Sequence, residues 1–246
     1  MFRLMRLRPP NGWQAVGWEL VIVTVGVLIA LGAQQLAEDR QGHSRALASV
    51  AAVEAELATD AGVFEERVIQ QVCEERRLAE VRAIIVAARS TRRLPRVTGI
   101  GKSITRPTLR TAWEEAQYSE VLDRWPQQER IGIGTIYSQQ EPSDATTLRE
   151  TAQWLKLQSM MEMMAGSLSD SDLSLLADVI GELTFLSWAN GIDARQLVEY
   201  ITARGIKPTY DIVLDKPGSI ADVRAQVAKS LICQPLSVQS ADPKTV

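Results

Sequence analysis

Residues 19–40, ELVIVTVGVLIALGAQQLAEDR, contain eighteen consecutive residues without a charge, Leu20 to Ala37. A helix of that length is about sufficient to cross a membrane. The stretch has no polar face, whereas a helix in the core of a soluble protein would have one. A cleaved signal peptide is the other alternative, but Leu31-Gly32-Ala33 is a poor cleavage site because Leu stands where a small residue is preferred. We therefore expect an uncleaved signal-anchor.

The charges and aromatic residues beside this stretch favour a cytoplasmic N-terminus. Three arginines precede it, Arg3, Arg6 and Arg8, whereas the basic residues that follow it are diluted by Glu38 and Asp39. Trp13 and Trp18 stand where an interfacial aromatic belt would lie. We expect residues 1–18 to form a cytoplasmic and interfacial segment and residues 19–37 to form a single span in contact with lipid in a bacterial inner membrane. The remaining residues would then lie in the periplasm.

Small side chains form a stripe along this expected span. Spacings of four and three alternate, and place the following residues on one side of a helix: Glu19, Val23, Gly26, Ala30, Ala33 and Ala37. Gly26 and Ala30 are a pair of small residues of the kind that lets two helices approach closely in lipid. The stripe predicts a homo-oligomer or a place in a membrane-protein complex. The alternative is that Gly and Ala are simply common in spans.

Composition limits what the rest of the chain does. With 246 residues, one domain with an extension is expected, and a mean hydropathy of −0.06 excludes a protein with many spans. The net charge of −3 argues against nucleic acid as a partner. His43 is the one histidine, which weakens every hypothesis that needs histidine catalysis or a multi-histidine metal site.

The pattern after the span predicts an all-α fold. Residues 38–90 are expected to form a long helix, with a seven-residue repeat at Leu36, His43, Val50, Leu57 and Phe64 that packs on later helices or forms a stalk. Residues 91–107 are expected to be a loop, residues 108–234 a helical bundle and residues 235–246 a flexible tail. Within the long helix, a solvated charged face is expected from Glu74, Glu75, Arg76, Arg77, Glu80 and Arg82.

Several local signals divide the expected bundle. A helix should end before Pro142, and others should begin at Asp144, at Ser169 with Asp172, at Asp193, and at Ser219 with Asp222. Residues 206–214 contain β-branched and aromatic types that suggest an extended segment.

Few residues carry chemistry. Cys73 and Cys233 would form a disulfide in an oxidising compartment, and two separate buried thiols are the alternative. The methionines at 160, 161, 163 and 164 either hold Cu(I) or, more simply, fill gaps in a core. Gly99 to Ser103 resembles the end of a P-loop, but Arg96 replaces its first glycine. With no GxSxG motif, we expect no catalytic residues, no cofactor and no metal ion.

Two blocks of the sequence resemble a group of uncharacterised bacterial single-span membrane proteins. They are WELVIVTVGVLIALGAQQLAEDR at residues 18–40 and TLRTAWEEAQYSEVLDRWPQQERIGIGTIYSQQ at residues 108–140. The resemblance implies a membrane anchor with an exported helical domain and assigns no catalytic residues. The sequence thus predicts a non-enzymatic accessory, scaffold or interaction subunit of a membrane complex. The alternative is a periplasmic ligand or metal sensor that signals through its span.

Overall fold

The computed structural model describes residues 12–239, with side chains from residue 17 onward. The three arginines of the expected cytoplasmic segment and the side chain of Trp13 lie outside the described residues. The last seven residues of the expected tail, 240–246, lie outside them as well.

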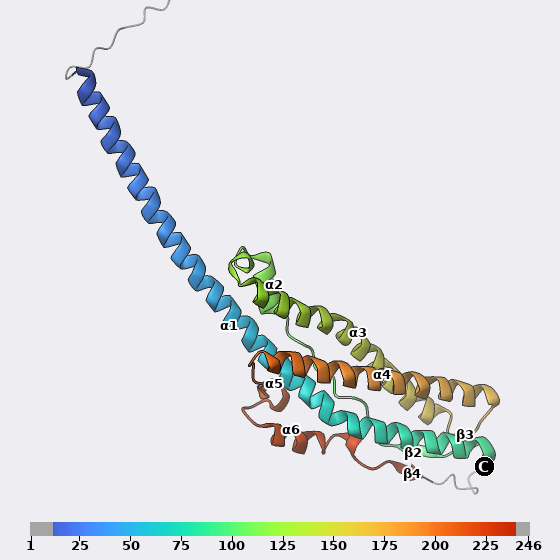
Figure 1. Ribbon diagram of the computed structural model, residues 1–246. Helices are drawn as coiled ribbons and strands as arrows, with labels where there is room; N and C mark the ends of the chain where they lie inside the picture. The colour runs from blue at the N-terminus through green and yellow to red at the C-terminus, as the bar shows by residue number, and fades with distance from the viewer. Residues whose placement is uncertain (1–11, 240–246) are drawn as a thin grey trace, which may run out of the picture.

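One helix organises the molecule. Helix α1 runs without a break over Gly12–Thr91, 80 residues, so that the expected span and the expected long helix are one element (Figure 1). Its sequence is rich in Ala, Leu, Glu and Arg and contains no proline, which suits a helix of this length. At 1.5 Å per residue it is about 120 Å long.

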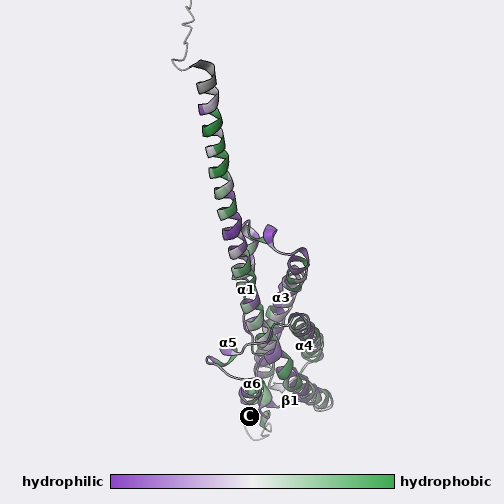
Figure 2. Cartoon of the chain, turned by 60° about the vertical axis from the view of Figure 1, so that its left-hand side comes forward, coloured by the Kyte–Doolittle hydropathy of each residue, from purple (hydrophilic) through white to green (hydrophobic). Residues whose placement is uncertain are grey.

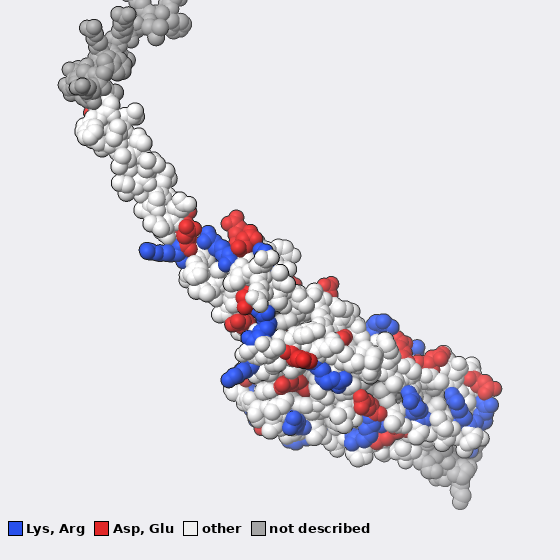
Figure 3. All heavy atoms as spheres, in the orientation of Figure 1, with Lys and Arg blue, Asp and Glu red and all other residues white. Residues whose placement is uncertain are grey.

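The first part of α1 stands clear of the bundle and fits a single-pass membrane anchor. Among the described residues, α1 is the one helix long and apolar enough to cross a membrane. Its most apolar 18-residue window has a mean hydropathy of 2.1, and none of that window is buried. Figure 2 shows the apolar turns of this part, and Figure 3 shows an uncharged stretch that ends where acidic and basic side chains gather at the near end of the bundle.

The second part of α1 packs against helix α4 (Asp170–Ala203), and α4 packs in turn against helix α3 (Gln127–Met163), whose side chains reach α1 (Figure 1). Three shorter helices complete the described fold: α2 (Thr111–Tyr118), α5 (Asp211–Leu214) and α6 (Ile220–Val227). Two single 3-10 turns are η1 (Leu122–Arg124) and η2 (Leu231–Cys233). The predicted all-α fold is confirmed.

Two small antiparallel strand pairs join distant segments. Strand β1 (Arg93–Leu94) pairs with β3 (Gly166–Ser167), and β2 (Arg96–Thr98) pairs with β4 (Ser237–Gln239). The expected loop at 91–107 therefore contains two strands, and the described part of the expected flexible tail is an ordered strand. Strands of two or three residues are too short to show an alternating pattern, and their partners are far away in sequence.

The predicted helix end before Pro142 is wrong, because α3 continues through it and contains Asp144 in its interior. Contacts with α1 hold α3 on both sides of the proline. Tyr137 Oη donates to Glu56 at 2.6 Å, and beyond the proline Glu150 accepts from Arg67 at 3.0 Å. These contacts outweigh the one backbone hydrogen bond that proline removes.

The predicted helix start at Asp193 is also wrong, because Asp193 lies inside α4. The nearby Gly191 reflects close packing and not a helix end: a Cβ there would lie 1.8 Å from Oε1 of Gln71 on α1. The capping boxes at Ser169 with Asp172 and at Ser219 with Asp222 are confirmed.

The segment at 206–214 is not a strand. Its first part is irregular and lies on α1, where the Thr209 N–H donates to the Ala58 carbonyl at 2.8 Å. Its last four residues form α5. A Cβ on Gly62 would lie 1.8 Å from the Thr209 carbonyl oxygen, so this close approach needs the glycine.

The apolar core follows α1 in two main clusters. One surrounds Leu57 near the span, and the other surrounds Val81 near the far end. The stretch of α1 between them is mostly polar, yet one face of it is buried, and this face holds the candidate site.

Candidate functional site

The middle of α1 carries buried polar side chains. The expected solvated face at 74–82 is wrong for two of its members, because Glu74 and Arg77 are both fully buried. A signal for this burial is present in the sequence. Spacings of three and four continue the apolar stripe of Val53, Leu57 and Phe64 through a polar set: Asp60, Arg67, Gln70, Glu74 and Arg77.

Eight side chains from four segments meet at this level. We call them the central polar network: Arg67, Gln70, Glu74, Ser103, Glu150, Trp154, Ser187 and Asn190. Glu74 lies at its centre, where Oε1 accepts from Gln70 Nε2 at 2.6 Å and from Ser103 Oγ at 2.6 Å. Its Oε2 accepts from Ser187 Oγ at 2.6 Å. With these donors and Arg67 around it, both oxygens of the Glu74 carboxylate have hydrogen-bond partners.

Arg67 joins the two carboxyl groups of the network. Its Nη1 lies 2.5 Å from Glu74 Oε1, and its Nη2 lies 2.9 Å from Glu150 Oε2. Glu150 also accepts from Trp154 Nε1 at 3.2 Å and from Asn190 Nδ2 at 2.5 Å. Burial raises the pKa of Glu150, the charge of Glu74 adds to the rise, and Arg67 and Asn190 oppose it.

A second acidic cluster lies nearer the span, at the start of α2. The N-cap residue of α2 makes no side-chain cap, and Glu56 of α1 takes that role by accepting from the Ala112 N–H at 2.8 Å. Asp60 accepts from the Leu109 N–H at 2.8 Å and from Gln140 Nε2 at 2.9 Å. Burial, assisted by the charges of Glu56 and Asp144, raises the pKa of Asp60 to about 7.

The central polar network leaves little room for a substrate. Ser103 Oγ lies beside a carboxylate, as a nucleophile lies beside its base, but Ser103 is 1% exposed and its hydroxyl also accepts from Gln70 at 2.8 Å. The cavity that touches Arg67 and Asn190 has a volume of about 40 Å³. That is room for a few water molecules, whereas ligand pockets are about 300 Å³ or larger. The central polar network therefore joins α1, α3 and α4 to one another and keeps ionisable side chains in the interior of the bundle.

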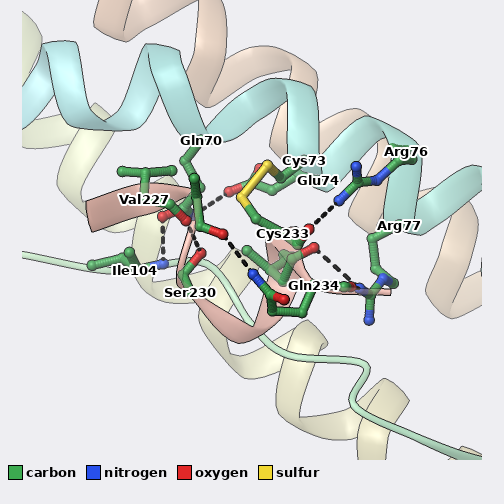
Figure 4. Close-up of a disulfide and its surroundings, with 12 residues drawn as sticks. Gln70, Cys73, Glu74, Arg76, Arg77, Ile104, Val227, Ser230, Cys233 and Gln234 are labelled. Carbon is green, nitrogen blue, oxygen red and sulfur yellow. Dashed lines mark hydrogen bonds between the residues drawn. A yellow bond between two sulfur atoms is a disulfide. The ribbon is translucent and has the colours of Figure 1, made fainter. Parts of the chain in front are cut away.

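Cys73 of α1 and Cys233 of η2 are joined in a disulfide, with their Cα atoms 4.9 Å apart (Figure 4). Beside it, the buried guanidinium of Arg77 donates to four backbone carbonyls, those of Gly99, Ile100, Ile232 and Gln234. The disulfide and this arginine attach both the 99–100 loop and the C-terminal segment to the same turns of α1.

The stripe residues of the span are all exposed. Nothing lies within 4 Å of the position that a Cβ on Gly26 would take. The same side of α1 continues beyond the span as small exposed residues, Ser44, Ala48 and Ala51. The exposed Arg40, seven residues after Ala33, interrupts this face between the span and Ser44.

The four clustered methionines do not converge on one point. Met160 and Met161 belong to the apolar core, whereas Met163 is 73% exposed. Within residues 12–239 the structure contains no group of three or more His, Cys, Asp or Glu side chains placed to hold a metal ion. His43 is exposed on α1.

The segment that resembles a P-loop contacts Arg77, which donates to the Gly99 carbonyl. Irregular chain follows this segment, where a P-loop would be followed by a helix. Gly99 and Gly101 have φ of 81° and 72°, which glycine adopts readily. At Gly101 a Cβ would lie 2.6 Å from the Ile232 backbone nitrogen, so the glycine permits contact with η2. The segment packs against the C-terminal end of the described chain.

Comparisons of the chain with models of protein families, with characterised proteins and with solved structures find no match. The fold and the site together define a class: an all-α bundle with a hydrogen-bonded polar interior, built on one helix that fits a single-pass membrane anchor.

Proposed function

We propose that this chain is a non-enzymatic accessory or scaffold subunit of a membrane complex, anchored in a bacterial inner membrane with its bundle in the periplasm. The observation that carries the proposal is the construction of α1, which joins an exposed apolar segment directly to a bundle with a filled interior. Such a molecule offers surfaces for partners and has little internal space for a reaction.

Two surfaces support an interaction role. The first is the small-residue face of the span, which suits contact with a second helix in lipid. The second is on α4, where Phe185 and Trp188 are 61% and 54% exposed with their ring centroids 6.0 Å apart. Aromatic side chains are enriched in the cores of protein interfaces.

The location rests on three observations. The disulfide suits an oxidising compartment. The arginines before the span favour a cytoplasmic N-terminus. The resemblance to single-span proteins with an exported helical domain points the same way.

A sensor that signals through the span is the second candidate. The continuity of α1 favours it, because a change in packing around residues 56–77 would reach the span through one uninterrupted helix. The divergence of the methionine thioethers gives no support to copper as its ligand.

The location is tested by labelling with a membrane-impermeant thiol reagent in intact cells. We expect Cys73 and Cys233 to react only after reduction, without lysis. A reporter supplies the control: Tyr118→Cys in a chain that also carries Cys73→Ser and Cys233→Ser, because Tyr118 is 91% exposed. The reporter should react in intact cells with or without reductant. A reporter that reacts only after lysis would place the bundle in the cytoplasm and overturn the proposed location.

A further inference from the structure

Two carboxamides beside fully buried acids share one feature. Asn190 Nδ2 donates to Glu150 at 2.5 Å, and Gln140 Nε2 donates to Asp60 at 2.9 Å. In each, the carboxamide oxygen is buried and has no hydrogen-bond partner among the described residues. All four side chains are at least 98% buried. The buried Gln153 oxygen also lacks a partner, but the acid beside it, Glu182, is only partly buried and pairs with Arg149. Buried polar atoms rarely lack a partner, so two such oxygens beside two buried acids need an explanation.

A proton on each acid provides that explanation. An ionised carboxylate only accepts hydrogen bonds, whereas a carboxylic acid has one O–H to donate. A carboxylic acid facing a carboxamide can form two bonds at once, because its O–H donates to the amide oxygen while the amide N–H donates to its other oxygen. Protonation of Asp60 and Glu150 would supply the donor that each oxygen lacks.

The charges around Glu150 point the same way. From α1 it faces Arg67 and Glu74, and from α4 the neutral Asn190, while Ser187 of α4 donates to Glu74. Glu74, with its full set of donors, balances the charge of Arg67. Glu150 shares this cation, because Arg67 Nη2 lies 2.9 Å from its Oε2, and so a second anion there would leave a net negative charge in the buried network, which is costly. Further away, the cavity is lined by Glu66 and Arg106, which pair with each other at 2.6 Å, and by Asp144.

Asp60 is in a similar position. Glu56 lies on its own helix, and Asp144 and Tyr137 face it from α3. The nearby cation Arg110 forms an ion pair with Asp144, at 3.6 Å, and not with Asp60. Glu56 accepts hydrogen bonds from the first N–H groups of α2 and from the Tyr137 hydroxyl. Asp60 would therefore be the second anion of its cluster.

We propose that Asp60 and Glu150 are two proton-binding sites, each held as a neutral acid–carboxamide pair, and that loss of the protons loosens α2 and α3 from α1. Each proton passes from a carboxyl oxygen to water and leaves a carboxylate. The 40 Å³ cavity lined by Arg67 and Asn190, both of which contact Glu150, has room for a water that would take the proton of Glu150. The carboxamide oxygens then lose their donors, and Glu56 with Asp60, and Glu74 with Glu150, become pairs of like charges.

The raised pKa values of both acids place proton release near neutral pH. The sign of the effect on stability follows. Between an unfolded-state pKa of about 4 and the higher value in the native state, the native chain binds more protons than the unfolded chain. The free energy of unfolding should therefore fall as the pH rises through this window.

Infrared spectroscopy of the full chain in detergent micelles tests the protonation directly. At about pH 6, exposed acids of ordinary pKa are ionised, and so a carbonyl band of protonated carboxylic acid should come from the buried sites. We expect this band in the native chain, its disappearance at about pH 9, and a loss of roughly half its area in Asp60→Asn and in Glu150→Gln. Asp178→Asn, an exposed acid on α4, is the matched control and should leave the band unchanged. A native chain without the band would overturn the proposal.

Thermal unfolding gives a second, independent readout. The amide groups introduced by Asp60→Asn and Glu150→Gln can donate to the orphaned oxygens as a carboxylic acid would. We expect the melting temperature of the native chain to fall between about pH 5 and pH 8, and that of the double variant to change much less. Protection of the Leu109 amide from hydrogen exchange should likewise fall with pH only where Asp60 is present. Equal destabilisation of the variants at every pH would show ionised native acids and contradict the proposal.

Discussion

At the scale of single residues, two glycines inside helices have opposite reasons to be there. Gly62 on α1 leaves space for the Thr209 carbonyl, whereas Gly181 on α4 has nothing within 4 Å of the position of a Cβ. We expect Gly181→Ala to raise the free energy of unfolding by about 0.5–1 kcal/mol, because alanine is the better helix former. Gly62→Ala should lower it, because the backbone at 209 must move.

Chemical denaturation of the two variants in the same detergent checks this pair. The helix-propensity gain is the same for both, so the difference between them isolates the contact of the 206–210 segment with α1. A rise of similar size in both variants would mean that this segment does not lie on α1 in solution.

Individual residues also mark the limit of what the sequence reveals. The periodicity predicts burial of Leu57 and Phe64, and the two capping boxes follow from Ser and Asp at the right spacing. The burial of Glu74 does not follow in this way. Its donors include Ser103 in a loop and Ser187 on α4. A single sequence does not show which hydroxyl groups, far away in the chain, will lie beside Glu74 in the fold. The two proton sites escape prediction for the same reason.

At the scale of elements, the disulfide is the covalent link between α1 and the C-terminal segment. Its cysteines are 160 residues apart in sequence. In the chain-entropy model, closing so long a loop stabilises the native state by about 4–5 kcal/mol. We expect Cys233→Ser to lower the free energy of unfolding by an amount approaching this value, measured by denaturation without reductant.

Reductant provides the control for this prediction. It should destabilise the native chain by a similar amount and leave Cys233→Ser unaffected, and Cys73→Ser should behave as Cys233→Ser does. A native chain that is insensitive to reductant would show that the two sulfurs are not joined.

The type of each helix could be predicted from the sequence more readily than the residues at which it begins and ends. Long helices are evident from composition and period. Their ends are not, because Pro142 and Gly191 are typical helix-ending residues that here lie inside α3 and α4. Tertiary contacts decide both positions, and the strand pairs β1–β3 and β2–β4 likewise depend on segments far apart in sequence.

At the scale of the whole molecule, self-association through the span is the property most open to test. Gly26→Leu would place a large side chain on the small-residue face and should weaken association by about 1 kcal/mol or more. Thr24→Leu is the matched control, because position 24 lies on nearly the opposite side of the helix. Cross-linking in native membranes measures both. Equal cross-linking of the two variants, or monomers alone in the native chain with no co-purifying protein, would contradict the proposed association.

The unbroken course of α1 has a geometric consequence for any assembly. The helix has no break between the span and the first bundle contacts. The orientation of every bundle surface about the membrane normal is therefore fixed by how the span is rotated about its own axis. One residue more or less between Ala37 and Ala46 would swing the exposed Phe185 and Trp188 by about 100° around the axis of α1 relative to Gly26. A partner that binds both the span and α4 must therefore match one fixed angle between these two surfaces about the axis of α1.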